Sequence, residues 1–266
     1  MTRRLAIMAG AAGLVACIAA AERAEAIPAG WTCVGQSVCG TLGPDGVVTA
    51  PPAFGPGYAY ITTAGAVGLN DAAIPVPTGQ ETNGSRLETN AFTLAVGDTL
   101  SFYFNYVTSD GAGFNDYAWA GLYDIVNDTT AILFTARTTP DGNTVPGFGL
   151  PGLDPNVTLV PPATPIIAGG PIWSPLGGWS GACYKVGCGY TGWIQMLYTV
   201  PQGGAATYKL VFGVTNALDE DYDSGMAIAG ATINGVPITP VPEPASLALL
   251  GLCLAGLAAV RRRKAA

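Results

Sequence analysis

The chain between its two ends is made of short runs in which side chains alternate between two faces. The clearest run covers residues 99–107, where every second residue from Leu100 is apolar and falls on one face of a strand. Residues 108–111 end this run with Thr, Ser, Asp and Gly, which favour a turn. Because no stretch shows apolar residues at helical spacing, the pattern predicts an all-β domain.

Five further runs have the same character, at residues 117–123, 130–136, 192–199, 207–215 and 226–233. The first two flank the turn-forming pair at residues 127 and 128, so we expect them to form a hairpin. Short strands with one covered face and many turns are typical of an antiparallel β-sandwich with a jelly-roll-like arrangement.

Residues 141–190 are rich in Pro and Gly and show little strand signal. A connection of this length is either a functional loop or a disordered insert, and aromatic residues in it argue against disorder. The aromatic residues in and just after this segment are Trp173, Trp179, Tyr184, Tyr190 and Trp193. They predict a platform on which sugar rings stack, and the alternative is that they cover the sandwich core.

An apolar run lies at each end of the chain. Near the N-terminus, Arg3 and Arg4 precede an apolar stretch over residues 5–21, and residues 24–26 read Ala-Glu-Ala. This arrangement predicts a signal peptide over residues 1–26 that is removed before Ile27. The alternative is a lipoprotein signal, in which residues 14–17 form a lipobox ending in Cys17.

The C-terminal apolar run covers residues 245–260 and contains no charged residue. As a helix it measures about 24 Å, which is short but workable against a hydrocarbon core of about 30 Å. The basic residues after it should remain cytoplasmic, which places the preceding residues outside. A buried core helix is the alternative, and it fits poorly because the run has no polar face.

The apolar run at 245–260 has a distinctive flank on each side. The residues before it are Val241, Pro242, Glu243 and Pro244, and those after it are Arg261, Arg262, Arg263 and Lys264. This order resembles the PEP-CTERM sorting signal, which implies recognition by an exosortase in the inner membrane of Gram-negative bacteria. The chain then divides into a signal peptide (1–26), an extracytoplasmic β-sandwich domain (27–240) and a sorting signal (241–266).

The body carries a second resemblance, in residues 108–111, 116–119, 187–193 and 221–228. Together these segments resemble the body domain of one group of PEP-CTERM proteins. The last segment also resembles the closing strand of several extracellular carbohydrate-binding jelly rolls. The resemblance implies a β-sandwich at the cell surface and supplies no established activity.

The charge of the body limits its partners. Residues 27–240 contain four basic and fifteen acidic residues, a net charge of −11. Such a charge opposes binding to nucleic acid, which requires clustered Lys and Arg, and it disfavours an electrostatic role at an anionic lipid surface.

Four cysteines lie in the body, namely Cys33, Cys39, Cys183 and Cys188. An exported protein meets an oxidising compartment, so we expect disulfides, and of the three connectivities the short spacings favour the two local pairs. The alternative, a four-cysteine zinc site, usually has shorter spacers and reduced thiols.

The chain contains no histidine. This removes the commonest general base, the Ser-His and Cys-His nucleophile pairs and most zinc-hydrolase sites. A glycosidase-type carboxylate pair remains, and Asp110, Asp116, Asp124 or the acids at 219–223 could provide it. Acids in turns more often face solvent or form Asx-turns, so we expect a protein without catalytic activity.

The acidic cluster of Asp219, Asp221 and Asp223 is the candidate for a bound calcium ion, because Ca²⁺ takes several oxygen ligands at once. The alternative is a solvated turn, since the EF-hand pattern is missing.

These observations predict a surface or extracellular-matrix protein that binds exopolysaccharide or has a structural role there. The association with exopolysaccharide is implied by the family resemblance. The rival interpretations are a secreted carboxylate-dependent glycan hydrolase and a passive matrix component without a specific ligand.

Overall fold

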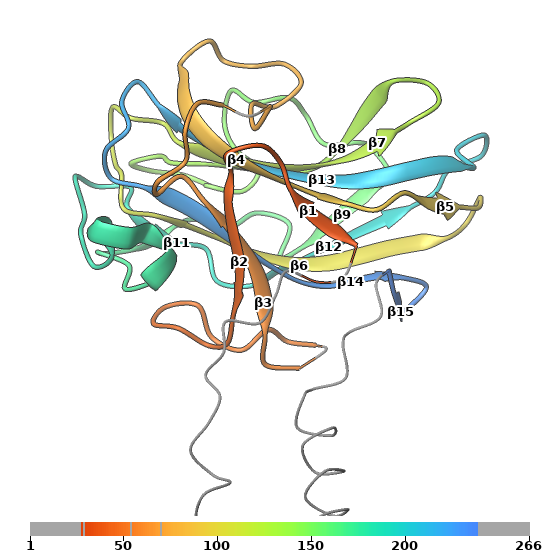
Figure 1. Ribbon diagram of the computed structural model, residues 1–266, viewed down its shortest axis with the longest axis horizontal. Coiled ribbons are helices and arrows are strands. Elements are labelled where there is room, and N and C mark those ends of the chain that lie inside the picture. The colour runs from red at the N-terminus through yellow and green to blue at the C-terminus, as the bar shows by residue number, and fades with distance from the viewer. Residues whose placement is uncertain (1–27, 29, 54, 70, 239–266) are drawn as a thin grey trace, which may run out of the picture.

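The structure is a computed structural model that describes residues 28, 30–53, 55–69 and 71–238. These residues form two antiparallel β-sheets, which lie as two layers in Figure 1. The fold is therefore the all-β antiparallel sandwich that the alternation predicted.

The first sheet has six strands, and β13 is central to it. From one edge to the other its order is β1 (Trp31–Cys33), β4 (Glu81–Thr89), β13 (Ala206–Ala217), β7 (Tyr117–Asp124) and β8 (Thr129–Arg137), with β5 (Phe92–Leu94) also paired to β13.

The second sheet has nine strands arranged around β6 and β14. Its main order is β10 (Ile167–Ala168), β11 (Gly189–Tyr190), β6 (Thr99–Thr108), β14 (Ser224–Ile233), β3 (Tyr58–Thr62) and β2 (Val38–Leu42). Off this path, β12 (Ile194–Thr199) pairs with β6 and with β9 (Val157–Val160), and β15 (Val236–Pro237) pairs with β14.

All six predicted strands are present, as β6, β7, β8, β12, β13 and β14. The predicted hairpin is confirmed, because β7 and β8 are antiparallel neighbours. Its turn is an Asx-turn in which Asp124 Oδ1 accepts hydrogen bonds from the backbone N–H groups of Val126 (2.9 Å) and Asn127 (3.0 Å).

The core between the sheets is built on aromatic rings from both layers. Phe104 of β6 stacks on Phe134 of β8 with ring centroids 3.7 Å apart, and Phe102 meets Phe212 of β13 edge-on at 5.3 Å. All four side chains are fully buried. Residues 102 and 104 share one face of β6, so the period-two alternation alone directs them into the same core.

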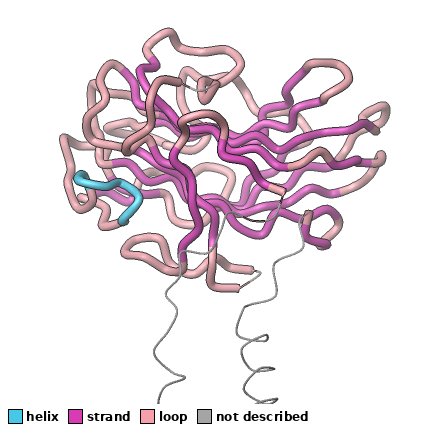
Figure 2. The backbone as a smooth tube through the Cα atoms, viewed as in Figure 1, coloured by secondary structure: helices cyan, strands magenta, loops and turns pink. Residues whose placement is uncertain are grey.

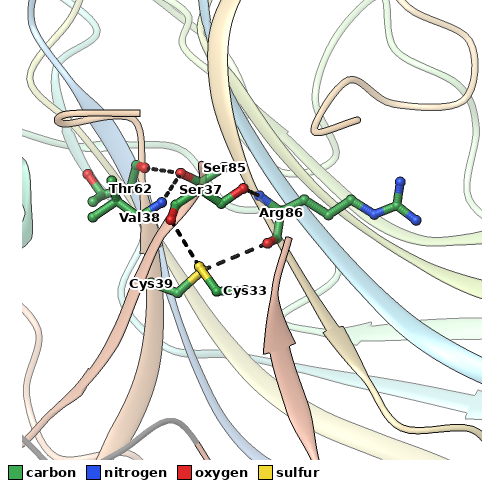
Figure 3. The surroundings of a disulfide bond; sticks show 7 residues. All are labelled: Cys33, Ser37, Val38, Cys39, Thr62, Ser85 and Arg86. Atoms are coloured by element: carbon green, nitrogen blue, oxygen red, sulfur yellow. Dashed lines mark hydrogen bonds between the residues drawn. A yellow bond between two sulfur atoms is a disulfide. The ribbon is translucent and has the colours of Figure 1, made fainter. Parts of the chain in front are cut away.

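Strands β1 to β5 were not predicted, because they are short or polar. Strands β1 to β4 are tied together near the disulfide between Cys33 and Cys39, which confirms the first predicted pair. Figure 3 shows this region, where the N–H of Val38 donates to Ser85 Oγ (2.8 Å) and Ser85 Oγ donates to the carbonyl of Thr62 (2.6 Å). A buried polar side chain thus joins β4 of one sheet to β2 and β3 of the other.

The long segment over residues 141–190 is ordered and holds several short elements. It contains β9, β10 and β11 and one 3₁₀ helix, η1 (Ser174–Trp179). Figure 2 shows this helix among loops at one end of the sandwich. Within the part of the chain that is described, no helix has the length and apolar character needed to cross a bilayer.

The two targeting predictions fall outside the described residues. They are the signal peptide over residues 1–26, with the alternative lipobox cysteine at Cys17, and the sorting signal over residues 241–266.

Candidate functional site

The five aromatic residues predicted to form one glycan platform do not share a surface. Trp173 is completely buried, its Nε1–H donates to the Tyr58 hydroxyl (2.9 Å), and its ring meets Tyr60 edge-on. A ring with no exposed face cannot stack on a sugar. The platform interpretation is therefore wrong for Trp173, and the core-packing alternative holds there.

Tyr190 and Trp193 lie with this buried group. Both are half-buried and pack against the apolar cluster that contains Trp173. The Trp193 ring meets Tyr58 edge-on at 5.8 Å, and its Nε1–H donates to the carbonyl of Thr49 (3.0 Å). The indole therefore packs against the core and also fastens the loop after β2.

The remaining two candidates, Trp179 and Tyr184, belong to a second group of rings, which we call the aromatic row. Trp179 stacks on Tyr222 with ring centroids 4.2 Å apart, Tyr222 contacts Tyr184 at 5.2 Å, and Tyr184 meets Phe114 edge-on at 5.3 Å. Tyr184 is 37% exposed and the other three rings are half-buried. The row is thus a partly exposed surface of four aromatic side chains.

Three connections between strands supply the aromatic row. Trp179 ends η1, Tyr184 follows in the same long segment, Phe114 lies in the β6–β7 turn and Tyr222 in the β13–β14 turn. Sequence reasoning missed Phe114 and Tyr222. The sequence contained one signal for Tyr222, because this residue lies between the acids of the 219–223 turn. That turn was interpreted only through its carboxylates.

A disulfide between Cys183 and Cys188 closes the loop that carries Tyr184, which confirms the second predicted pair. The loop packs tightly on the β6–β7 turn, since a Cβ on Gly111 would lie 2.5 Å from the carbonyl oxygen of Lys185. The backbone N–H of Tyr184 donates to the carbonyl of Ser109 (3.0 Å). These contacts fix the position of the Tyr184 ring.

Charged groups surround the aromatic row. Glu220 and Asp221 are exposed in the β13–β14 turn, and the Lys185 ammonium lies 4.8 Å from the centre of the Tyr184 ring. The same turn holds Tyr222 at a φ of 54°. A left-handed conformation of a non-glycine residue costs on the order of 1–3 kcal/mol and is commoner at functional sites.

The predicted calcium ligands are not gathered around one point. Asp223 turns inward and its Oδ1 accepts a hydrogen bond from the Thr63 hydroxyl (2.8 Å), whereas Asp219 Oδ1 accepts from the N–H of Asp221 (3.1 Å). Among the described residues no group of three or more Asp, Glu, Cys or His side chains is placed to hold a metal ion. The turn therefore offers no preformed metal site.

Two carboxyl groups are buried in the connection between β6 and β7, which also carries Phe114 of the aromatic row. Asp116 is completely buried, and its oxygens accept hydrogen bonds from the N–H of Ala217 (2.8 Å) and the hydroxyl of Ser224 (2.7 Å). Burial raises the pKa of Asp116 well above its ordinary value, and the charge of Asp110 raises it further.

Asp110 is only 1% exposed and less well satisfied. Its Oδ1 accepts a hydrogen bond from the N–H of Gly111 (2.7 Å), while its Oδ2 has no partner among the described residues. Burial raises the pKa of Asp110 from its ordinary value of 3.8 to about 7, with smaller contributions from the charges of Asp219 and Asp221.

The carboxylates proposed for a hydrolase do not line an open cleft together. Asp110 and Asp116 are both buried, and Asp124 serves the β7–β8 turn. Acid–base chemistry on a glycosidic bond needs two carboxyl groups that both reach the substrate. The arrangement therefore suits a structural role for Asp110 and Asp116.

Comparisons with known proteins identify the C-terminal segment. Residues 240–264 match the family model of the PEP-CTERM protein-sorting motif. No curated protein matches the chain.

Several solved structures resemble the fold weakly. The K1 cleaved adhesin domain of Lys-gingipain from Porphyromonas gingivalis has a TM-score of 0.36 at 12% identity, with 78% of this chain and 91% of that domain covered. A carbohydrate-binding module studied for specific mannan recognition has a TM-score of 0.34 at 14% identity, covering 77% and 87% of the two chains. The enzymatically active domain of tailspike protein 4 from bacteriophage CBA120 has a TM-score of 0.33 at 10% identity, and the match covers 77% of this chain but 19% of that one.

Proposed function

We propose that this chain, which carries the PEP-CTERM sorting motif at residues 240–264, is a non-catalytic component of an extracellular polysaccharide layer that binds glycan through the aromatic row. In this proposal an exosortase in the inner membrane processes the exported precursor, and the β-sandwich is then displayed at the cell surface or released into the matrix.

The observation that carries the binding proposal is the aromatic row itself. Four rings from three connections are held together at one end of the sandwich, and all of them keep part of their surface exposed. Sugar rings present C–H faces that stack on such aromatic surfaces, while exposed carboxylates accept hydrogen bonds from hydroxyl groups. Aromatic surface that stays exposed contributes no hydrophobic stabilisation to the fold. Contact with a ligand would bury this surface, which gives a physical reason for its position outside the core.

The charge around the row points to the kind of glycan. Glu220 and Asp221 are exposed beside Tyr222. Polymers that carry carboxylates or sulfates would be repelled at this surface. Neutral or amine-bearing sugars are therefore the ligands that fit the aromatic row.

The test is affinity electrophoresis of the protein through gels that contain the host's matrix polysaccharide. Replacing Trp179 with alanine should weaken retention roughly threefold to tenfold, the size expected for one lost aromatic contact. Trp193→Ala is the matched control, because it removes an indole of similar burial that lies outside the row.

Two further outcomes separate the rival functions. A glycan hydrolase would release new reducing ends from the polysaccharide, and a passive matrix component would show no retention at all. If the wild type and Trp179→Ala were retained equally, the aromatic row would not be the surface that contacts the polysaccharide.

A further inference from the structure

A hollow of about 580 Å³ opens beside the end of β8, within the usual size of small-molecule sites, about 300–1,000 Å³. Its lining combines apolar side chains with one guanidinium and two polar side chains. The lining residues are Val76, Pro77, Thr78, Gln80, Arg137, Gly149, Leu150 and Pro151.

Arg137 is 6% exposed, and its guanidinium is bonded only to neutral groups. Nε donates to the carbonyl of Asn115 (3.2 Å), Nη1 to the carbonyl of Phe148 (3.3 Å) and Nη2 to Gln80 Oε1 (3.5 Å). These contacts are longer than the ~2.7–2.9 Å of charge-assisted hydrogen bonds. Since a guanidinium has five N–H donors, two of them take no part in these contacts.

The other guanidinium of the described body is paired with acid. Arg86 contacts Glu88 Oε1 at 2.5 Å, and Lys209 contacts Oε2 of the same residue at 3.1 Å. Arg137 forms no ion pair among residues 28–238 as described. A buried charge without a charged partner is costly, which is why buried cations in proteins are normally paired.

Glu81, the acid whose charge acts on Arg137, cannot neutralise it fully. Glu81 attracts the guanidinium, but its carboxylate is already occupied on both oxygens. Oε1 accepts hydrogen bonds from the N–H of Thr78 (2.7 Å) and the hydroxyl of Tyr117 (2.8 Å), and Oε2 accepts from the N–H of Gly79 (2.9 Å). The free edge of the guanidinium is therefore left without a carboxylate among the described residues.

We propose that the hollow beside Arg137 binds a carboxylate carried on a sugar ring, as in the uronic acids of acidic polysaccharides. The planar fork of a guanidinium matches a carboxylate with two parallel hydrogen bonds. The apolar walls formed by Val76, Leu150 and Pro151 suit the C–H face of a ring. The guanidinium carbon lies over the Phe148 ring, 5.0 Å from its centre, and this ring, 46% exposed, extends the apolar surface beside the cation.

This site goes beyond the proposed role of the aromatic row and does not depend on it. It differs in ligand chemistry, because the row lies in an acidic setting whereas the hollow holds a cation. The protein would then contact neutral and acidic sugars with separate surfaces.

The experiment compares galacturonate, galactose and acetate as ligands of the protein recovered from its host. Binding is followed by the shift in melting temperature and by calorimetric titration at millimolar ligand. We expect galacturonate to bind, acetate to bind more weakly because it lacks the ring, and galactose to show no binding because it lacks the carboxylate.

The informative variant is Gln80→Glu, since Gln80 is exposed and already contacts Nη2. The new carboxylate should occupy the guanidinium, raise the melting temperature by about 2–4 °C and weaken galacturonate binding at least about tenfold. Gln202→Glu is the matched control, because it adds the same charge in the exposed turn between β12 and β13. This control should change neither the melting temperature nor the affinity for galacturonate.

Three results would overturn the proposal. They are an absence of galacturonate binding by the wild type, equal binding of galactose and galacturonate, and a Gln80→Glu variant that binds galacturonate as tightly as the wild type. None of these measurements involves the aromatic row. A failure of this proposal would therefore leave the result of the polysaccharide-retention test unchanged.

Discussion

The buried carboxyl group of Asp110 should make the protein less stable as the pH rises from 4 to 7. The pKa of Asp110 is raised to about 7 in the folded state, chiefly by burial, against an ordinary value of 3.8. In this pH range the unfolded chain releases the proton while the folded chain keeps it. The free energy of unfolding therefore falls as the pH rises.

The magnitude follows from linkage. Each pH unit between the two pKa values costs about 1.4 kcal/mol per group, so Asp110 alone should remove about 3 kcal/mol of stability between pH 4 and pH 7. Asp110→Asn keeps an oxygen for the N–H of Gly111 but cannot ionise. The variant should match the wild type at pH 4 and exceed its stability by about 3 kcal/mol at pH 7.

Urea denaturation at several pH values measures this difference directly.

Asp116 is a poorer choice for substitution, because both of its oxygens accept hydrogen bonds and an amide would lose one of them. Asp124→Asn is the control of opposite sign, since hydrogen bonds from Asn127 lower the pKa of Asp124. The stabilising charge of Asp124 is lost on acidification, so the advantage of the wild type over Asp124→Asn should shrink as the pH falls below 3.8 and should stay constant above it. Identical pH slopes for Asp110→Asn and the wild type would refute the reasoning.

Two further predictions concern the core and the targeting segments. Trp173→Ala should lower the free energy of unfolding by about 3–5 kcal/mol, as for other large aromatic residues removed from a core; a cost below about 1 kcal/mol in urea denaturation would contradict the burial of its ring. The mass of the protein recovered from its host should correspond to a start at Ile27 and to loss of residues 245–266. A retained C-terminal segment or a lipidated Cys17 would instead mean a membrane-tethered protein.

The sequence determined those features that depend on local order along the chain. The alternation over residues 99–107 identified β6, because successive side chains of a strand point to opposite faces wherever the strand lies. The two disulfides followed from their short spacings, which leave the paired cysteines within reach of each other. The C-terminal sorting motif is likewise a linear signal, and its family match needs no fold.

Strand β4 shows where local order was insufficient. Its sequence is polar, with Asn83, Ser85 and Thr89 buried, so no alternation of apolar residues identifies it. Ser85 is tolerated inside because Thr62 accepts its hydroxyl hydrogen and Val38 donates to it. These partners come from strands far away in the sequence, and only the folded chain brings them together.

The candidate site was likewise decided by tertiary structure. Trp173 and Trp179 look equivalent in the sequence, but one is buried in the core and the other stacks on Tyr222 from a different turn. In the same way, Asp110 looks like an ordinary turn acid until the Tyr184 loop covers it. The exposure and the pKa of a side chain depend on which distant segments pack over it. Composition and spacing could therefore identify these side chains as candidates, but they could not predict their roles.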